Sequence, residues 1–316
     1  MSPRSLYLLP TNYCPLNCTH CAIQDKTNPR CDLDIAIVEQ LICDAPKQQF
    51  SISIISGGGE PMMVDEKILC RILQASSREN LLPKMTTNAY WATSFDEACR
   101  RLQPIVESGL KNLVISISES HQEYVKYDKV LNAVNAANYL NLRCELYLTT
   151  LNEKTDPVQD VVKYFNSYQQ TPPPIHMEYY YIPFGNAGVN YDLSDFQLKD
   201  VNNLKGTCPS AGNNICVHPN GAVTFCAMVF ALHVKALHVG NIYSDNLAKI
   251  MQRVDKNCLM QWFAVHGIVA LKEVVEQNTD ISFADKYVNI CHLCCEMLLN
   301  PKVRQFLQHI GLINEI

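Results

Sequence analysis

The stretch CPLNCTHC at residues 14–21 decides the fold, and it follows directly on the apolar run SLYLLP at residues 5–10. The run reads as a buried strand, so Cys14, Cys18 and Cys21 lie on the loop that leaves it. Three thiolates on one loop can hold three irons of a cubane cluster and leave the fourth iron without a protein ligand. Structural zinc would need a fourth thiol or imidazole at a suitable separation, and none stands nearby. The spacing therefore favours an iron–sulfur cluster with one open iron.

Five further apolar runs with the character of buried strands follow between residues 50 and 183. They are FSISIIS (50–56), PKMTTN (83–88), LVISIS (113–118), CELYLTT (144–150) and HMEYYYIP (176–183). Helical patterns lie between them, with Asp34, Asp65 and Ser94 as expected N-caps and Gly109 as a C-terminal stop. Such alternation implies parallel strands joined by right-handed crossovers. Spacing alone allows either a partial barrel or an open, doubly wound sheet.

The pattern changes near residue 195, where we expect a second domain. The run ICVHPNGAVTFC at residues 215–226 predicts a hairpin at Asn220-Gly221. Helical stretches follow at residues 246–255 and 262–278, and then the compact run NICHLCCEML at residues 289–298. The predicted division is therefore residues 1–195 and 196–316.

The composition excludes several classes of protein. A net charge of -5 without a basic stripe gives no basis for binding nucleic acid or an anionic membrane. No stretch approaches the roughly 20 apolar residues of a membrane span, and no secretory signal is visible, so we expect a cytoplasmic protein. Fifteen cysteines are many for a reducing compartment, and clustered ones point to metal or catalytic roles. We read the scattered cysteines as small buried side chains; they are Cys31, Cys43, Cys70, Cys99 and Cys144.

Four other motifs follow predicted strands, where ligand sites of parallel α/β folds gather. The motif SGGGEP at residues 56–61 follows the second strand, TNA at residues 87–89 the third, SISES at residues 116–120 the fourth, and YIPFGNA at residues 181–187 the sixth. A run of glycines lets the backbone approach a ligand closely, and the adjacent Glu60 can receive an ammonium group.

With these motifs the sequence resembles the radical S-adenosylmethionine (SAM) superfamily. The resemblance implies a partial (β/α)6 TIM barrel over about residues 5–185, a [4Fe-4S] cluster on the three loop cysteines, and SAM chelated by the open iron. An electron from the cluster then yields a 5′-deoxyadenosyl radical that abstracts a substrate hydrogen. The residues that the resemblance assigns to SAM are His20, Gly58, Gly59, Glu60, Asn88, Ser116, Ser118 and Ile182. Ser118 stands where the family usually has an acid, Ala89 where it has glycine, and Asn186 where it has arginine.

A second metal site is expected on Cys208, Cys226, Cys291 and Cys294, which flank the hairpin and close the compact run. The arrangement resembles the twitch domain, a shortened SPASM domain that carries one auxiliary [4Fe-4S] cluster. Zinc is the competing interpretation, because four thiolates suit it too. Cys216 reads as a core residue. Cys295 could replace Cys294, return a hydrogen atom to a substrate radical, or simply be packed.

The substrate leaves two hypotheses open. The first is a maturase of a ribosomally made precursor peptide that crosslinks, epimerises or excises, with a Tyr-rich rim at residues 178–181 to receive the chain. It would need a separate recognition protein, and an external electron donor of the flavodoxin or ferredoxin type. The second is a dehydrogenase or epimerase of aminoglycoside or aminocyclitol sugars, favoured by the segment that holds Ser118, Ser120, His121 and Tyr124.

Side chains that could manage a proton or a hydrogen atom are Glu119, His121 and Cys295. A hypothesis from another class is a zinc-binding interaction protein without catalysis, which requires the loop and the strand-end motifs to coincide by accident.

Overall fold

Six parallel strands form the centre of the fold, and each pairs with the next along the chain. The computed structural model describes residues 4–22, 29–154 and 156–313, without the side chains of residues 178–180 and 229. The strands are β1 (Arg4–Leu8), β2 (Phe50–Ile55), β3 (Leu82–Thr87), β4 (Asn112–Ile117), β5 (Arg143–Thr150) and β6 (Ile175–Tyr180). A doubly wound sheet would reverse its strand order at a switch point. The unbroken order β1 to β6 confirms the partial (β/α)6 barrel.

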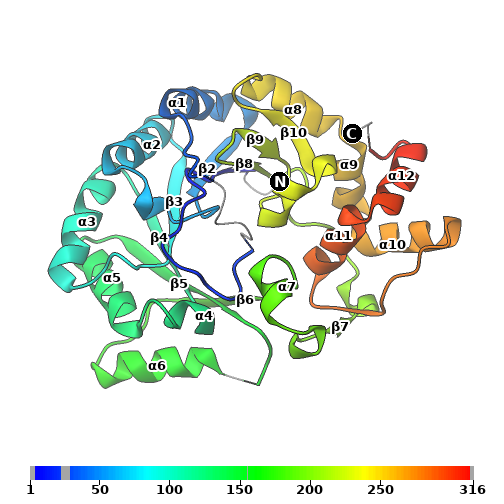
Figure 1. Ribbon diagram of the computed structural model, residues 1–316. Helices are drawn as coiled ribbons and strands as arrows, with labels where there is room; N and C mark the ends of the chain where they lie inside the picture. The colour runs from blue at the N-terminus through cyan, green and yellow to red at the C-terminus, as the bar shows by residue number, and fades with distance from the viewer. Residues whose placement is uncertain (1–3, 23–28, 155, 314–316) are drawn as a thin grey trace.

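Helices cover the outer face of this curved sheet (Figure 1). They are α1 (Ile35–Asp44), α2 (Glu66–Arg78), α3 (Phe95–Glu107), α5 (Tyr127–Tyr139) and α6 (Pro157–Ser167). The expected N-caps are confirmed, because the side chains of Asp34, Asp65 and Ser94 each accept backbone N–H groups of the first turn. Gly109 follows α3 at φ +109°, a conformation that suits glycine.

The predicted hairpin extends the same sheet. Its strands β8 (Asn214–Val217) and β9 (Ala222–Thr224) are antiparallel, and β10 (His238–Asn241) follows β9. The turn runs from His218 to Gly221, which has φ +80°. β8 lies parallel to β1, so the strand order is β10-β9-β8-β1-β2-β3-β4-β5-β6. The sheet and one apolar core therefore run across residue 195, where we placed the domain division.

The C-terminal part is mainly helical. It contains α7 (Asn186–Asn190), α8 (Leu247–Asp255), α9 (Cys258–Val265), α10 (Gly267–Asn278), α11 (Ile290–Leu299) and α12 (Pro301–His309). A small sheet pairs β7 (Lys199–Asp200) with β11 (Lys286–Tyr287). Short 3-10 segments lie at Pro46–Gln48, Pro61–Met63, Leu193–Asp195, Val201–Leu204, Val229–His233 and Lys235–Leu237.

The helical stretch that we expected at residues 262–278 is broken. Gly267 has φ +74°, and a Cβ there would collide with the carbonyl oxygen of Gly206. The chain therefore bends by 111° between α9 and α10. Among the described residues no single helix is long and apolar enough to span a membrane, and only this bent pair passes such a test when joined.

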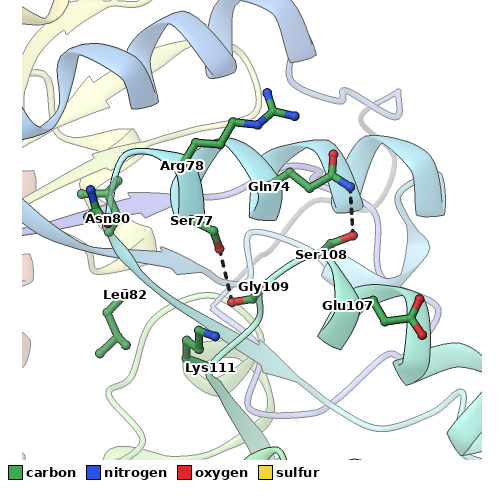
Figure 2. Close-up of a pocket in the computed structure, with 10 residues that line it drawn as sticks. Gln74, Ser77, Arg78, Asn80, Leu82, Glu107, Ser108, Gly109 and Lys111 are labelled. Atoms are coloured by element: carbon green, nitrogen blue, oxygen red, sulfur yellow. Dashed lines mark hydrogen bonds between the residues drawn. The ribbon is translucent and has the colours of Figure 1, made fainter.

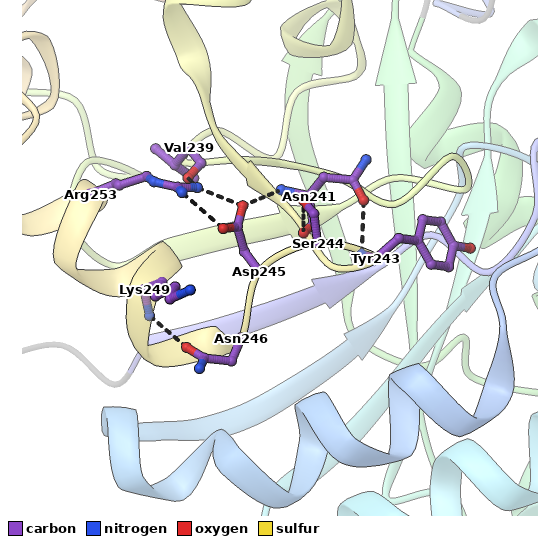
Figure 3. A network of polar contacts seen from close by, with 8 residues as sticks. All are labelled: Val239, Asn241, Tyr243, Ser244, Asp245, Asn246, Lys249 and Arg253. Carbon is purple, nitrogen blue, oxygen red and sulfur yellow. Dashed lines mark hydrogen bonds and ion pairs between the residues drawn. The ribbon is translucent and has the colours of Figure 1, made fainter.

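An ion pair fixes the turn between β10 and α8 (Figure 3). Arg253 Nη1 and Nη2 lie 2.6 and 2.8 Å from the two carboxylate oxygens of Asp245. This pairing lowers the pKa of Asp245, whose Oδ2 also accepts the backbone N–H of Asn241. The bidentate geometry sets the direction in which α8 leaves the sheet.

Candidate functional site

The cysteine loop, residues 12–22, lies across the carboxyl ends of the barrel strands and is packed first against the motif after β2. The backbone N–H of Glu60 donates to the carbonyl of Tyr13 at 2.8 Å. Gly59 lies so close to Tyr13 that a Cβ would collide with the backbone of that residue. Gly58 faces the side chain of Leu9 instead, where a Cβ would lie 3.3 Å from a methyl group. Gly59 therefore serves the packing of the loop, a role that the glycine run alone did not reveal.

Glu60 is buried and is the centre of a hydrogen-bond network. Its Oε1 accepts the hydroxyl of Thr87 at 2.6 Å and the N–H of Met62 at 3.1 Å, and its Oε2 accepts the N–H of Asn88 at 2.9 Å. Burial nevertheless raises the pKa of this carboxyl to about 7. Since each carboxylate oxygen can accept two hydrogen bonds, Oε2 keeps capacity for a further donor, as an ammonium ligand requires.

The turn after β3 carries Asn88 to the loop. Asn88 Nδ2 lies 3.6 Å from Cys14 Sγ, and its Oδ1 accepts the N–H of Tyr90 at 3.0 Å. Ala89 has φ +59°, so the turn keeps the left-handed conformation even though alanine replaces glycine.

The second half of the loop is held by α4 (Glu119–Gln122) and α7. Thr19 Oγ1 lies 2.7 Å from both Ser120 Oγ and the hydroxyl of Tyr191. Asn186 donates its backbone N–H to the carbonyl of Cys21 at 2.8 Å and its Nδ2 to the carbonyl of Cys18 at 3.0 Å. Sequence analysis missed Thr19 and Tyr191 because no local pattern connects residues 172 positions apart.

Next to the loop, three rings pack together. His20 stacks on Tyr181 with centroids 4.4 Å apart and meets His121 edge-on at 4.7 Å. Burial lowers the pKa of His20 to about 3 and that of His121 to about 4, so both imidazoles are neutral near pH 7. His121 Nδ1 lies 2.7 Å from Ser118 Oγ, whereas His20 Nδ1 is buried without a hydrogen-bond partner. That orphaned nitrogen is one of the observations that fit an additional polar group here.

The remaining predicted residues near SAM and the substrate lie at the same edge. Ser116 pairs with Tyr147 across β4 and β5, and Ile182 is buried just beyond β6. Glu119 Oε1 accepts the hydroxyl of Thr150 at 3.0 Å. Glu119 therefore stabilises the end of β5, in addition to any role toward a substrate.

The donor set of the loop suits a cubane cluster better than a single ion. No group of three or more His, Cys, Asp or Glu side chains in the described ranges converges as one metal ion requires. A cubane asks for less convergence, because each thiolate binds a different iron. The cysteine loop is anchored to the ends of β2, β3, β4 and β6, and its three thiols are compatible with binding three different irons of one cluster.

The four cysteines proposed for the second site lie near one another, with Cys208 before the hairpin, Cys226 after it, and Cys291 and Cys294 on α11, although within the described residues they do not converge on a position for a single ion. Burial raises the pKa of Cys294 well above its usual range, and charge on Cys226, Cys291 and Cys208 raises it further. Burial together with neighbouring thiols also raises the pKa values of Cys226 and Cys291 to about 12. Neutral thiols in the metal-free chain would have to release protons to become ligands.

The other cysteines have different surroundings. Cys216 is fully buried opposite Thr224 in the hairpin, and burial, followed by the charge of Cys226, raises its pKa. Cys295 is buried beside Cys294 and belongs to the apolar core. Among the scattered cysteines only Cys144 is buried; Cys31, Cys70 and Cys99 are half-buried and Cys43 is exposed, so our interpretation of all five as buried side chains was wrong for Cys43 and holds only in part for the other three. The exposed position of Cys43 follows from its place on the outer face of α1.

A hollow of about 560 Å³ lies at the opposite end of the barrel (Figure 2). It is bounded by the last turns of α2 and α3 and by the starts of β3 and β4, with Ser77, Ser108 and Lys111 among its lining residues. The strand ends that carry the motifs face away from it. Its position at the amino-terminal edge is typical of a surface that serves stability.

The comparisons with known proteins bear on the fold. No family model matches the chain, and no curated protein matches its sequence. Among solved structures, anSMEcpe with a hexahistidine tag and bound AdoMet matches with a TM-score of 0.55 and 15% identity, over 99% of this chain and 100% of that one. BtrN in complex with AdoMet and 2-DOIA matches with a TM-score of 0.51 and 14% identity, over 84% of this chain and 88% of that one. Native anSMEcpe with AdoMet and the Cp18Cys peptide matches with a TM-score of 0.55 and 13% identity, over 97% and 99%.

These likenesses define the class of fold, a partial barrel shared with proteins whose structures contain bound AdoMet. More particularly, the chain has the fold of anSMEcpe over 99% of its length and that of BtrN over 84% of its length.

Proposed function

We propose that this chain is a radical SAM enzyme with a SAM-binding [4Fe-4S] cluster on Cys14, Cys18 and Cys21. When bound, the cluster and SAM supply a 5′-deoxyadenosyl radical that abstracts a hydrogen atom from the substrate. The observation that carries the proposal is the convergence of four strand-end motifs on one loop with three thiols. A zinc-binding interaction protein without catalysis would give no reason for the four motifs to lie against the same cysteine loop.

Different residues are proposed to contact different parts of SAM and the substrate. Glu60 Oε2 offers a buried acceptor for the ammonium group of SAM, in a place that water does not reach. His20 Nδ1 offers an unpartnered polar atom to the nucleoside part, beside Tyr181 and His121. His121, neutral near pH 7 and 2.7 Å from Ser118 Oγ, can hydrogen-bond a substrate group, but its lowered pKa makes it a weak base for proton transfer.

Anaerobic reconstitution tests the proposal. We expect about eight irons per chain if both sites fill, about four if only the first fills, and formation of 5′-deoxyadenosine from SAM with a strong reductant. An external donor of the flavodoxin or ferredoxin type would supply the electron in the cell. A colourless protein that takes up zinc and produces no 5′-deoxyadenosine would contradict the proposal.

The second site, on Cys208, Cys226, Cys291 and Cys294, is proposed to hold one auxiliary [4Fe-4S] cluster. Four thiolates leave no vacant iron, so this site suits electron transfer rather than substrate ligation. Substitution of Cys226 by Ser should lower the iron content by about four per chain and leave the cleavage of SAM measurable.

We infer that the substrate is a ribosomally made precursor peptide, presented by a separate recognition protein. The inference is supported by the two structures of anSMEcpe with bound peptides, each of which matches 96% or more of this chain. The Tyr-rich rim that we expected to receive the peptide includes residues 178–180, whose side chains lie outside the described part of the structure; Tyr181 is buried and stacks on His20.

The alternative substrate is an aminocyclitol or aminoglycoside sugar, favoured by the match to BtrN with 2-DOIA. In the segment that suggested this substrate, Ser118 Oγ lies 2.7 Å from His121 Nδ1, and the hydroxyl of Tyr124 donates to the carbonyl of Asn17. Yet Ser118 and Tyr124 both use their hydroxyls within the protein. Measuring whether a peptide or an aminocyclitol stimulates 5′-deoxyadenosine formation separates the two.

A further inference from the structure

The side chain of Asn88 donates a hydrogen bond to a cysteine sulfur of the loop. Its Nδ2 lies 3.6 Å from Cys14 Sγ, an ordinary distance for an N–H donor to the large sulfur atom. Asn88 is 6% exposed, so water does not compete for this contact. Hydrogen bonds to ligand sulfurs are among the features that set the reduction potential of iron–sulfur clusters.

The orientation of the Asn88 amide is fixed by its other contacts. Its Oδ1 accepts the backbone N–H of Tyr90 at 3.0 Å, so the amide nitrogen must be the end that faces Cys14. Its own backbone N–H donates to Glu60 Oε2 at 2.9 Å. The amide therefore does not need to reorient when a thiolate forms on Cys14.

The turn around Asn88 is held from both sides at some cost. Ala89 keeps φ +59°, which an L-residue other than glycine adopts at the expense of local strain. Thr87 Oγ1 compensates by accepting the N–H of Ala89 at 3.3 Å and the indole N–H of Trp91 at 2.9 Å. The contacts of Thr87 Oγ1 with Ala89 and Trp91 therefore stabilise the strained turn. In this conformation the Asn88 amide lies next to Cys14 Sγ.

We propose that Asn88 is a positioning residue that raises the reduction potential of the cluster on Cys14, through a hydrogen bond to the sulfur rather than through contact with SAM. The donor withdraws electron density from the thiolate, which favours the cluster form that has accepted an electron. This proposal rests on the function proposed above.

The experiment measures the midpoint potential of the reconstituted enzyme by EPR-monitored redox titration without SAM. Asn88→Ala removes the donor, and we expect a threefold to tenfold lower ratio of reduced to oxidised cluster at a given applied potential; tenfold corresponds to about 59 mV for one electron. Asn88→Asp keeps the acceptor for Tyr90 but places a carboxylate at the sulfur, so the potential should fall further.

Asn152 provides the matched control. Its Oδ1 accepts the N–H of Lys154 at 2.9 Å in the same kind of turn, but its Nδ2 donates to the carbonyl of Asp195 at 2.8 Å. Asn152→Asp should leave the potential unchanged. Loaded Asn88 variants with the wild-type potential would overturn the proposal while leaving the radical SAM assignment intact, whereas a wild type without any cluster would refute the assignment itself.

A second measurement covers the case in which the variants do not load iron. Wild-type enzyme labelled with 15N in asparagine side chains should show, in pulsed EPR of the reduced cluster, a 15N coupling in place of the 14N coupling of the unlabelled enzyme. Identical spectra from labelled and unlabelled enzyme would equally overturn the role of Asn88.

Discussion

Thr19, on the cysteine loop, and Ser120, in α4, hold their hydroxyl oxygens 2.7 Å apart although 101 positions separate them in the sequence. Tyr191 approaches the same Thr19 oxygen from beyond α7 at the same distance. A hydroxyl can donate once and accept twice, so this trio can be fully satisfied. The loop is thereby attached to the ends of two strands on the far side of the barrel from β2.

Replacing Thr19 by Val keeps the shape of the side chain and removes both contacts. We expect a loss of about 1–3 kcal/mol in the free energy of unfolding, because the partner hydroxyls lose their shared neighbour. Faster removal of iron from the loop by a chelator should accompany it. Thr93→Val, outside this trio, serves as the control; equal iron release from both variants would argue against a role for the trio.

Gly59→Ala should disrupt the cysteine loop, because the added methyl group meets the backbone of Tyr13, which cannot move aside cheaply. Overpacking of this kind costs about 1–3 kcal/mol or more. The iron content after reconstitution should fall by about four per chain. Gly58→Ala is the informative comparison, since its methyl group would lie 3.3 Å from the flexible side chain of Leu9 and at an ordinary 3.6 Å from the carbonyl oxygen of Thr11, and should spare the iron content.

Glu60→Gln should weaken both the fold and the affinity for SAM. An amide NH2 would face at least one of the three donors that the carboxylate now accepts, at a cost of about 1–3 kcal/mol. Isothermal titration of the cluster-loaded protein with SAM checks the second effect. Glu97→Gln, which alters only an exposed pair with Arg100, should change neither quantity measurably; undiminished SAM affinity in the Glu60 variant would remove that residue from the binding site.

His121 makes the folded chain sensitive to acid. Its pKa is lowered from 6.5 to about 4 by burial, so between these values the unfolded chain binds more protons than the folded one. The stability that the neutral ring contributes is complete above pH 6.5 and is lost as the pH falls toward 4, by about 3 kcal/mol at most. The difference in unfolding free energy between wild type and His121→Asn, measured by urea titration, should shift by that amount across the window. A stability difference that does not change with pH would contradict the burial of His121 as a neutral ring.

Single substitutions by Ser test the choice of auxiliary ligands. Cys294→Ser should remove about four irons per chain, whereas Cys216→Ser and Cys295→Ser should keep them. Cys294 interacts with Cys226, Cys291, Cys208 and Cys295, whereas burial and Glu296 alone raise the pKa of Cys295. If the Cys294 variant keeps its iron and the Cys295 variant loses it, Cys295 and not Cys294 is the fourth ligand.

The sequence predicted the barrel strands and the strand-end motifs well because both are local features. Periodicity, N-caps such as Asp34 and the Asn220-Gly221 turn depend only on residues near them in the chain. The pairing of β8 with β1 was beyond such reasoning, because nothing in residues 214–217 encodes a partner 209 positions earlier. The break at Gly267 was also missed, although a glycine within a helical pattern can end a helix, as Gly267 does at φ +74°.

The parallel pairing of Tyr7 with Cys216 has a mechanical consequence. Strand β1, which leads into the cysteine loop, and the hairpin, which leads to Cys226, are hydrogen-bonded into one sheet. The distance between the two groups of cysteines is therefore set by this sheet and not by the length of the chain that connects them. Lengthening the connecting chain should leave the distance between the two groups of cysteines unchanged. An electron passing between the two proposed clusters would then cross a fixed distance, not one that varies with domain motion.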